Sequence, residues 1–154
     1  MHILTFTTLA EFPARLEAHL RAFPKLDRTA PEPVGSNNVA LPILLNGVLT
    51  FETLFHTRLS LLLETDRPVL DLDADYEDQA PTSLVSFDRI ATAFEAARKR
   101  TLSILGDLTE AQWARQGTLD GVDVTVIGLV HLLTAHDLEQ LADLQRQLAA
   151  RNAL

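Results

Sequence analysis

The spacing of His136 and Gln140 is the feature of this sequence that comes closest to a recognisable chemical site. Residues four apart on a helix lie one turn above each other on one face, so two histidines at this spacing can bind one metal ion. The second position is a glutamine here, and a neutral side-chain amide is a weaker ligand for transition metals than an imidazole. The pair therefore has the form of a metal site that has lost one ligand.

Any further ligand must come from the apolar helix predicted over residues 41–64, where the candidates are Asn46, Glu52 and His56. Glu52 has a carboxylate that could bind a metal ion or act as a base, although a glutamate on a long helix is more often solvated. A single histidine on an apolar helix face is likewise more often packed in the core than bound to a metal. Glu52, His136 and Gln140 are therefore the candidate metal ligands, and for Glu52 and His136 the structural alternative stays open.

Composition limits the class of protein to which the chain can belong. The 154 residues include no cysteine and carry a formal net charge of −8. Without cysteine there is no disulfide and no thiolate ligand, so His, Asp and Glu must carry any metal or acid–base chemistry. The negative charge argues against a nucleic-acid partner, and we expect the basic cluster at residues 98–100 on a solvated helix face. No apolar run could span a membrane and no secretory signal is visible, so we expect a cytoplasmic protein without a membrane partner.

Apolar periodicity predicts one domain over residues 1–154, with an all-α, four-helix-bundle fold. The expected helices span residues 8–23, 41–64, 83–105 and 124–150, and the first would start at a capping box formed by Thr8 and Glu11. Residues 24–38 and 115–123 are expected as loops. A long acidic connection over residues 65–81 can cross the end of a bundle and let the second and third helices run parallel. The predicted core positions are Leu9, Phe12, Leu16, Leu20 and Phe23, then Leu44, Val48, Phe51, Phe55, Leu59 and Leu62, then Leu84, Phe87, Ala91, Phe94, Ile104 and Leu105.

The last predicted helix is apolar on two sides. The side that flanks His136 carries Leu129, Leu132 and Leu133. The opposite side carries Ile127, Val130, Leu138 and Leu141. A helix that is apolar on two sides is buried on two sides, so it either occupies a central packing position or forms a subunit interface. We expect a homodimer formed through this helix.

Four segments together resemble the DinB-like family of four-helix-bundle metalloproteins, the damage-inducible DinB superfamily. They are Arg58-Leu-Ser-Leu-Leu-Leu-Glu-Thr-Asp-Arg-Pro-Val-Leu70, Leu108-Thr-Glu-Ala-Gln-Trp113, the loop from Gly117 to Gly121, and Leu129-Val-His-Leu-Leu-Thr-Ala-His-Asp-Leu-Glu-Gln-Leu141. The resemblance implies an up-down-down-up bundle with a long crossover between the second and third helices, and it implies frequent homodimerisation. It also implies a divalent ion, nickel or zinc in many members, and some members are thiol-dependent transferases or isomerases.

The family's metal is held by one histidine from the start of the second helix and by a pair four residues apart on the fourth. Carried over to this sequence, these positions are Gly47, His136 and Gln140, so one of the three ligands is kept. We therefore predict a degenerate metal site without a resident cofactor, in a bundle that is non-enzymatic or binds a small molecule. The alternative is a divalent-metal-dependent thiol S-transferase or isomerase whose ion is held by His136 with help from Glu52, Gln140 or water, and the sequence leaves enzymatic activity undecided.

Overall fold

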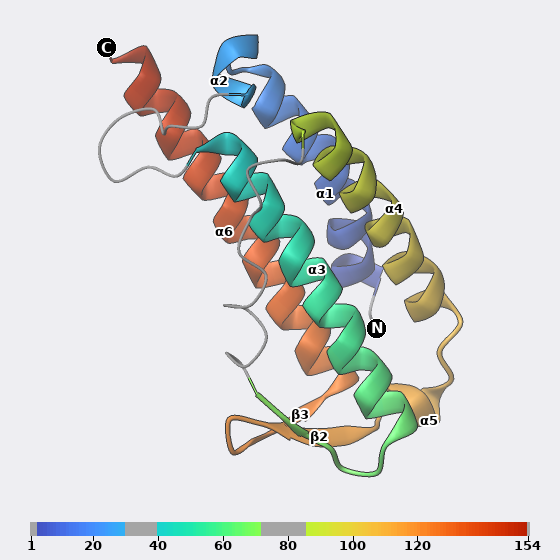
Figure 1. Ribbon diagram of the computed structural model, residues 1–154. Helices are drawn as coiled ribbons and strands as arrows, with labels where there is room; N and C mark the ends of the chain where they lie inside the picture. Colours follow the sequence, from blue (N-terminus) through green and yellow to red (C-terminus); the bar gives the residue numbers. More distant parts are fainter. Residues whose placement is uncertain (1–2, 30–39, 72–85, 154) are drawn as a thin grey trace.

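Four long helices form a bundle in the computed structural model, which describes residues 3–29, 40–71 and 86–153 (Figure 1). This confirms the four-helix-bundle prediction. In chain order the elements are α1 (Ile3–Arg21), α2 (Lys25–Thr29), α3 (Leu41–Glu64), β1 (Val69–Leu70), α4 (Phe87–Gly106), α5 (Glu110–Trp113), β2 (Gln116–Leu119), β3 (Val122–Thr125) and α6 (Val126–Asn152). No helix in the described part of the chain is long and apolar enough to cross a membrane.

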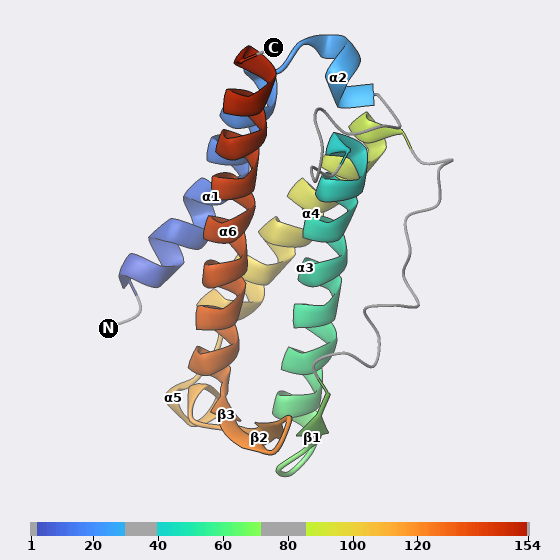
Figure 2. The same ribbon diagram turned by 90° about the vertical axis from the view of Figure 1, so that its left-hand side faces the viewer.

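The long helices run in two directions. Figures 1 and 2 show α1 and α6 running towards the end opposite the sheet, whereas α3 and α4 both run towards the sheet. Most of the predicted acidic connection, and the predicted core residue Leu84, fall within residues 72–85 and lie outside the described residues.

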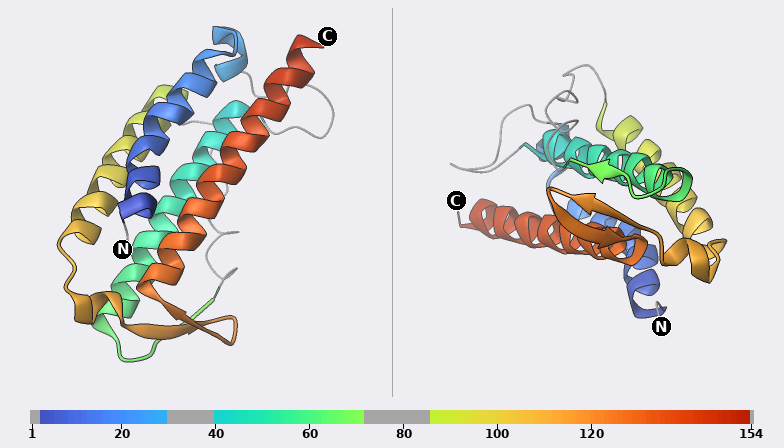
Figure 3. Two further views of the ribbon diagram at one scale, coloured as in Figure 1. Left: turned by 180° about the vertical axis from the view of Figure 1, so that it is seen from behind. Right: turned by 90° about the horizontal axis from the view of Figure 1, so that it is seen from below.

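A small sheet closes one end of the bundle, where the sequence predicted a loop. Strands β2 and β3 pair antiparallel, and β1 adds to β2 in parallel through Val69↔Thr118 and Leu70↔Leu119. The turn between β2 and β3 consists of Asp120 and Gly121, with φ of 50° and 78°. Left-handed geometry at both central residues defines the hairpin turn that an Asp-Gly pair favours. Figure 3 shows this sheet lying across the ends of α3 and α6.

Gly117 fixes the approach of β2 to the chain beneath it. The N–H of Thr118 donates to the backbone oxygen of Pro68 at 3.0 Å. A Cβ atom on Gly117 would lie 2.6 Å from that same oxygen, closer than real Cβ contacts allow. The residue must therefore be a glycine for β1 and β2 to pair at this distance.

The apolar core is divided into two clusters along the bundle. The cluster at the end away from the sheet includes Phe12, Leu16, Leu20, Phe23, Leu41, Leu44, Leu45, Val48, Ile90, Phe94, Leu141 and Leu144. The cluster next to the sheet includes Leu9, Phe55, Leu59, Leu62, Leu70, Leu105, Leu119, Val126, Leu129, Val130 and Leu133. The predicted core positions in α1 and most of those in α3 and α4 belong to these clusters, whereas Phe51, Phe87, Ala91 and Ile104 are half-buried.

Three details of the helices differ from the sequence predictions. Helix α1 begins at Ile3, so Thr8 lies inside it and is not its cap. Residues 25–29 form the short helix α2 within a predicted loop, whose residues 30–38 lie outside the described part. Helix α4 begins at Phe87, and Ser86 accepts a hydrogen bond from the N–H of Arg89 as its cap. Local capping signals are weak compared with packing, which here extends α1 by a full turn.

The two apolar sides of α6 are explained by packing within one chain. Val130 and Leu141 are buried, at 2% and 3% exposed, although they were placed on a second, outward side. Leu138 and Leu132 keep 47% and 40% of their surface exposed. Because α6 packs against both α1 and α3, it needs two apolar sides inside the monomer. Homodimerisation stays a prediction, and the continuous second patch that motivated it is not present.

Candidate functional site

Arg98 lies at the centre of the bundle, between the two core clusters, and its guanidinium is shared by two carboxylates. Glu52 on α3 accepts hydrogen bonds from Arg98 Nε at 2.9 Å and from Nη2 at 2.8 Å. Asp137 on α6 accepts from Nη1 at 2.8 Å and from Nη2 at 2.9 Å. All three side chains are at most 1% exposed. Two bidentate, charge-assisted pairs hold the planar guanidinium in a single orientation.

A fifth hydrogen bond joins Arg98 to α1. Its Nη1 atom donates to the backbone oxygen of Leu9 at 3.0 Å. In an unbroken helix that oxygen would accept from the N–H four residues later, but residue 13 is a proline and has no N–H. Arg98 supplies the missing donor and thereby uses all five of its N–H groups. One side chain thus links all four long helices and fixes their relative register.

The central layer of Arg98, Glu52 and Asp137 carries one surplus negative charge when all three groups are ionised. Burial opposes the charge on Arg98, but its hydrogen bonds to Glu52 and Asp137 outweigh burial and raise its pKa. Burial raises the pKa of Asp137 from its usual 3.8 to about 6, although Arg98 acts in the opposite direction. Because a single guanidinium can balance only one carboxylate, we regard Asp137 as the group on which the layer takes up a proton.

A chain of hydrogen bonds connects this layer to His56, which is half-buried. Thr101 Oγ1 lies 2.5 Å from Glu52 Oε1 and 2.5 Å from His56 Nε2. A hydroxyl has one proton, and the carboxylate can only accept it, so His56 Nε2 must be the donor to Thr101. Burial lowers the pKa of His56, which favours the neutral ring with its proton on Nε2. His56 therefore donates a hydrogen bond to Thr101 on α4, and Thr101 in turn donates to Glu52.

His136 lies beside the central layer and is followed directly by Asp137. Its ring stacks on Phe51 of α3, with ring centroids 3.9 Å apart and an interplanar angle of 3°. Its Nδ1 atom is buried and has no hydrogen-bond partner. Burial and, to a smaller extent, the charge of Arg98 together lower the pKa of His136 from 6.5 to about 4, so the ring is neutral at pH 7. An orphaned nitrogen on a neutral imidazole is the one feature here that suits a metal ion.

The remaining donors do not fit a tight nickel or zinc site. Helices α3 and α6 are antiparallel, so Gly47 and Gln140 lie at the same level, one turn beyond the stack of Phe51 on His136. Gly47 has no side chain, and Gln140 offers only an amide. Within residues 3–29, 40–71 and 86–153, no three His, Asp or Glu side chains are grouped so that they could hold a metal ion. Such sites normally need three or four good ligands, and this position offers one.

Two expectations about charged residues are wrong. Glu52 is fully buried, so its interpretation as a solvated glutamate fails, and its two oxygens are engaged by Arg98 and Thr101. Arg98 is buried as well, whereas its neighbours Lys99 and Arg100 are exposed as predicted. The signal was present in the spacing, because each charged residue of the layer lies on an apolar helical stripe. The stripes are Val48, Glu52, Phe55 and Leu59 on α3, Phe94, Arg98, Thr101 and Leu105 on α4, and Leu133, Asp137, Leu141 and Leu144 on α6.

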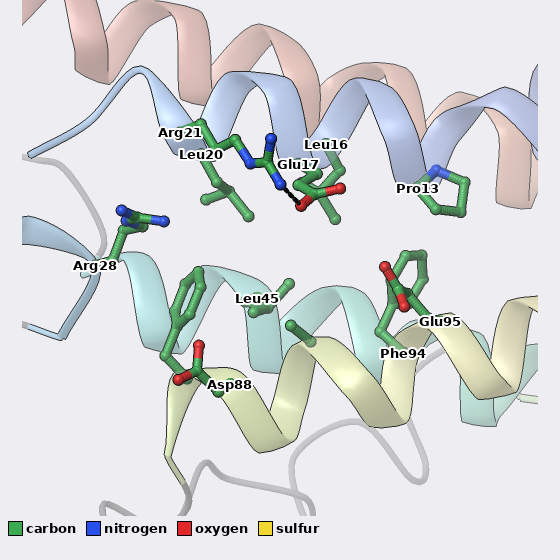
Figure 4. A pocket seen from close by; sticks show the side chains of 12 residues that line it. Pro13, Leu16, Glu17, Leu20, Arg21, Arg28, Leu45, Asp88, Phe94 and Glu95 are labelled. Atoms are coloured by element: carbon green, nitrogen blue, oxygen red, sulfur yellow. Dashed lines mark hydrogen bonds and ion pairs between the residues drawn. The ribbon is translucent and has the colours of Figure 1, made fainter. Parts of the chain in front are cut away.

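A pocket with a cavity volume of about 150 Å³ lies between α1 and α4 (Figure 4). Its apolar surface comes mainly from three helices, with Leu16 and Leu20 of α1, Leu45 of α3, and Phe87, Ala91 and Phe94 of α4. Arg28 of α2 lies at one end, and its Nε atom is buried without a hydrogen-bond partner. A concave apolar surface with one unsatisfied polar group is the usual form of a small-molecule site. No sequence pattern pointed to this pocket.

Comparisons with known proteins support the fold. No protein-family model and no curated protein matches this sequence. The chain is similar in structure to YfiT from Bacillus subtilis, described as "a probable metal-dependent hydrolase with an unusual four-helix bundle topology". The TM-score is 0.79, the similarity covers 97% of this chain and 86% of YfiT, and the sequences are 15% identical. At this identity the likeness shows a shared bundle fold and assigns no activity.

Proposed function

We propose that this chain is a DinB-like bundle with a degenerate metal site, which binds a small molecule and does not catalyse a metal-dependent reaction. The observation that supports the proposal is the engagement of Glu52 and Asp137 by Arg98, through four hydrogen bonds of 2.8–2.9 Å. Glu52 is one of the candidate metal ligands, and it acts electrostatically on His136. A metal could recruit Glu52 or Asp137 only by breaking buried ion pairs, and removing one partner of such a pair is strongly unfavourable.

Metal content tests this proposal directly. Tag-free protein, dialysed and analysed for metals, should contain far less than one nickel or zinc ion per chain. The variant Gly47→His with Gln140→His should bind one ion per chain in the same fold, because it adds two imidazoles beside His136. One tightly held ion in the unaltered protein would refute the degenerate site.

A matched control tests whether metal binding by the double variant depends on His136. Adding His136→Phe to that double variant preserves the ring stack on Phe51 but removes one of three imidazoles, so metal binding should fall back. If the double variant folds and gains no affinity, the assignment of Gly47 and Gln140 to the ligand positions is wrong.

The pocket between α1 and α4 supports the small-molecule part of the proposal. None of its lining side chains accepts a hydrogen bond from Arg98, so ligand binding there leaves the ion pairs of Arg98 intact, although Phe94 contacts both the pocket and Arg98. Its cavity volume of about 150 Å³ is below the roughly 300–1,000 Å³ of drug-sized ligand sites, but it matches a cavity that binds one small aromatic molecule such as benzene. A second candidate function is the divalent-metal-dependent thiol S-transferase or isomerase. The unpartnered Nδ1 of His136 favours it, and so does the description of YfiT as metal-dependent. Metal-stimulated consumption of a low-molecular-weight thiol by the purified protein would support this second candidate.

A further inference from the structure

We propose that the pocket between α1 and α4 binds a small monoanion with an apolar body, whose carboxylate pairs with Arg28. The inference rests on the proposed function only in its premise that the chain binds a small molecule. It names the site and the chemical class of that ligand, and it does not depend on whether a metal ion can be bound beside His136.

Arg28 is the group in this pocket with unused binding capacity. No described carboxylate lies within ion-pair distance of it, and its Nε atom is buried without a partner. The other arginine of the pocket, Arg21, instead donates to Glu17 at 2.5 Å. A guanidinium has five donors in a planar fork that matches a carboxylate. The carboxylate of an acidic ligand would therefore accept the hydrogen bond that Arg28 Nε does not make within the protein.

The short helix that carries Arg28 is held in place by its neighbour. Asp27 forms an ion pair with Arg151 near the end of α6, and its N–H donates to the backbone oxygen of Pro24 at 2.9 Å. These contacts fix α2 at the end of the pocket before a ligand arrives. A binding group that is positioned in advance loses less entropy on binding, which favours affinity.

The rest of the pocket selects for an apolar body and against a second negative charge. Figure 4 shows Leu16 and Leu20 on the α1 side and Phe94 on the α4 side of the space beside Arg28. Asp88 and Glu95 add two exposed carboxylates on the α4 side. They would repel a dianion such as a phosphate monoester or a dicarboxylate. The chemistry therefore fits a monocarboxylate with an aromatic or alkyl chain.

Three probes with one apolar body and different head groups test the inference: phenylbutyrate, phenylbutanamide and phenylbutylamine. Titration calorimetry on the full chain should show that the carboxylate binds about ten-fold tighter than the neutral amide, because it gains charge-assisted hydrogen bonds to Arg28. The ammonium compound should bind no tighter than the amide. Tightest binding by the ammonium compound would overturn the proposal and assign the pocket to cations through Asp88 and Glu95.

Variants locate the site. In Arg28→Gln the carboxylate should lose its advantage and bind like the amide, whereas Lys25→Gln on the same short helix is the matched control, since it removes one positive charge outside the pocket. Ala91→Met, which fills the pocket, should weaken all probes that bind there. An unchanged affinity in Arg28→Gln, or no carboxylate binding at millimolar concentration, would refute the inference. Either result leaves the metal analysis of the proposed function unaffected.

Discussion

Arg98 and Arg28 differ in how far the fold uses their guanidinium groups. Arg98 is 1% exposed, and all five of its N–H donors are bonded to α1, α3 and α6. Arg28 is half-buried at the end of a pocket, and its Nε atom has no partner. The difference teaches that burial of a charge does not identify a functional site. A fully satisfied charge holds helices together, and a partly satisfied one retains the capacity to bind.

The centre of this bundle already holds a cation between its two buried carboxylates. Two carboxylates converging between helices require a cation, whether that cation is a divalent metal or a guanidinium. Here the cation is covalently part of α4, and it lies over the rings of Phe12 and Phe94 at 5.1 and 5.2 Å. These cation–π contacts offset part of the cost of burying the charge.

The largest expected effect comes from removing the satisfied arginine. Arg98→Met keeps an unbranched apolar stem but leaves Glu52 and Asp137 buried without a countercharge and the Leu9 oxygen without a donor. Breaking a buried pair in this way should lower the free energy of unfolding by about 3–5 kcal/mol. Urea denaturation monitored by circular dichroism would measure this loss.

The control for this variant is Arg100→Met, two residues along the same helix and exposed. Its effect should stay within about 0.5 kcal/mol. If both variants cost the same, the central layer contributes no more than a surface charge, and the contrast between satisfied and unsatisfied arginines has no energetic basis.

The sequence predicted the frame of this molecule because apolar spacing reports directly on burial. The predicted second helix, residues 41–64, coincides with α3, and the five core positions predicted for residues 8–23 are all buried. The same reasoning failed for Arg98, because residue type was given more weight than position. Arg98 lies on the same face of α4 as Phe94 and Leu105. It could point to solvent only if α4 rotated and exposed these two apolar side chains.

Other features depend on tertiary structure and had weaker signals. Asp120-Gly121 is a hairpin signal, but the flanking strands have only four residues each and carry several polar side chains. The loss of the Leu9 partner follows from Pro13, yet no local rule says that Arg98, 89 residues away, supplies the replacement. The pocket arises from the spacing of α1 and α4, which depends on how the whole bundle packs.

A second, smaller effect concerns the pH dependence of the central layer. The pKa of Asp137 is raised to about 6, so the folded state binds this proton more tightly than the unfolded state and gains stability as the pH falls from 6 to 4. The pKa of His136 is lowered to about 4, so the folded state resists protonation and loses stability over nearly the same range. Each contribution is on the order of 3 kcal/mol, with opposite sign, and they nearly cancel.

Two variants separate these contributions. Asp137→Asn has no carboxylate to protonate, so it lacks the stabilisation that the unaltered protein gains at low pH. Between pH 7 and pH 4 the variant should therefore lose about 3 kcal/mol more stability than the unaltered protein. His136→Phe keeps a ring on Phe51 but has no imidazole to protonate. As the pH falls from 7 to 4, the stability of this variant relative to the unaltered protein should therefore rise by a similar amount. Urea midpoints at pH 4, 5, 6 and 7 would show both trends, and parallel curves for all three proteins would contradict the assigned pKa shifts.

The smallest expected effect completes the comparison, because the unsatisfied arginine should contribute little to the fold. Arg28 makes no ion pair with a described carboxylate, so Arg28→Gln leaves no buried charge without a partner. The free energy of unfolding should change by less than about 0.5 kcal/mol without ligand, because the substitution breaks no ion pair with a described residue. A saturating carboxylate should then stabilise the unaltered protein but not the variant, because a ligand raises stability only when it binds the folded state. Thermal melting of both proteins with and without phenylbutyrate measures this difference. A loss of several kcal/mol in the ligand-free variant would instead show that Arg28, like Arg98, is a structural charge and that its open donor is satisfied by the fold itself.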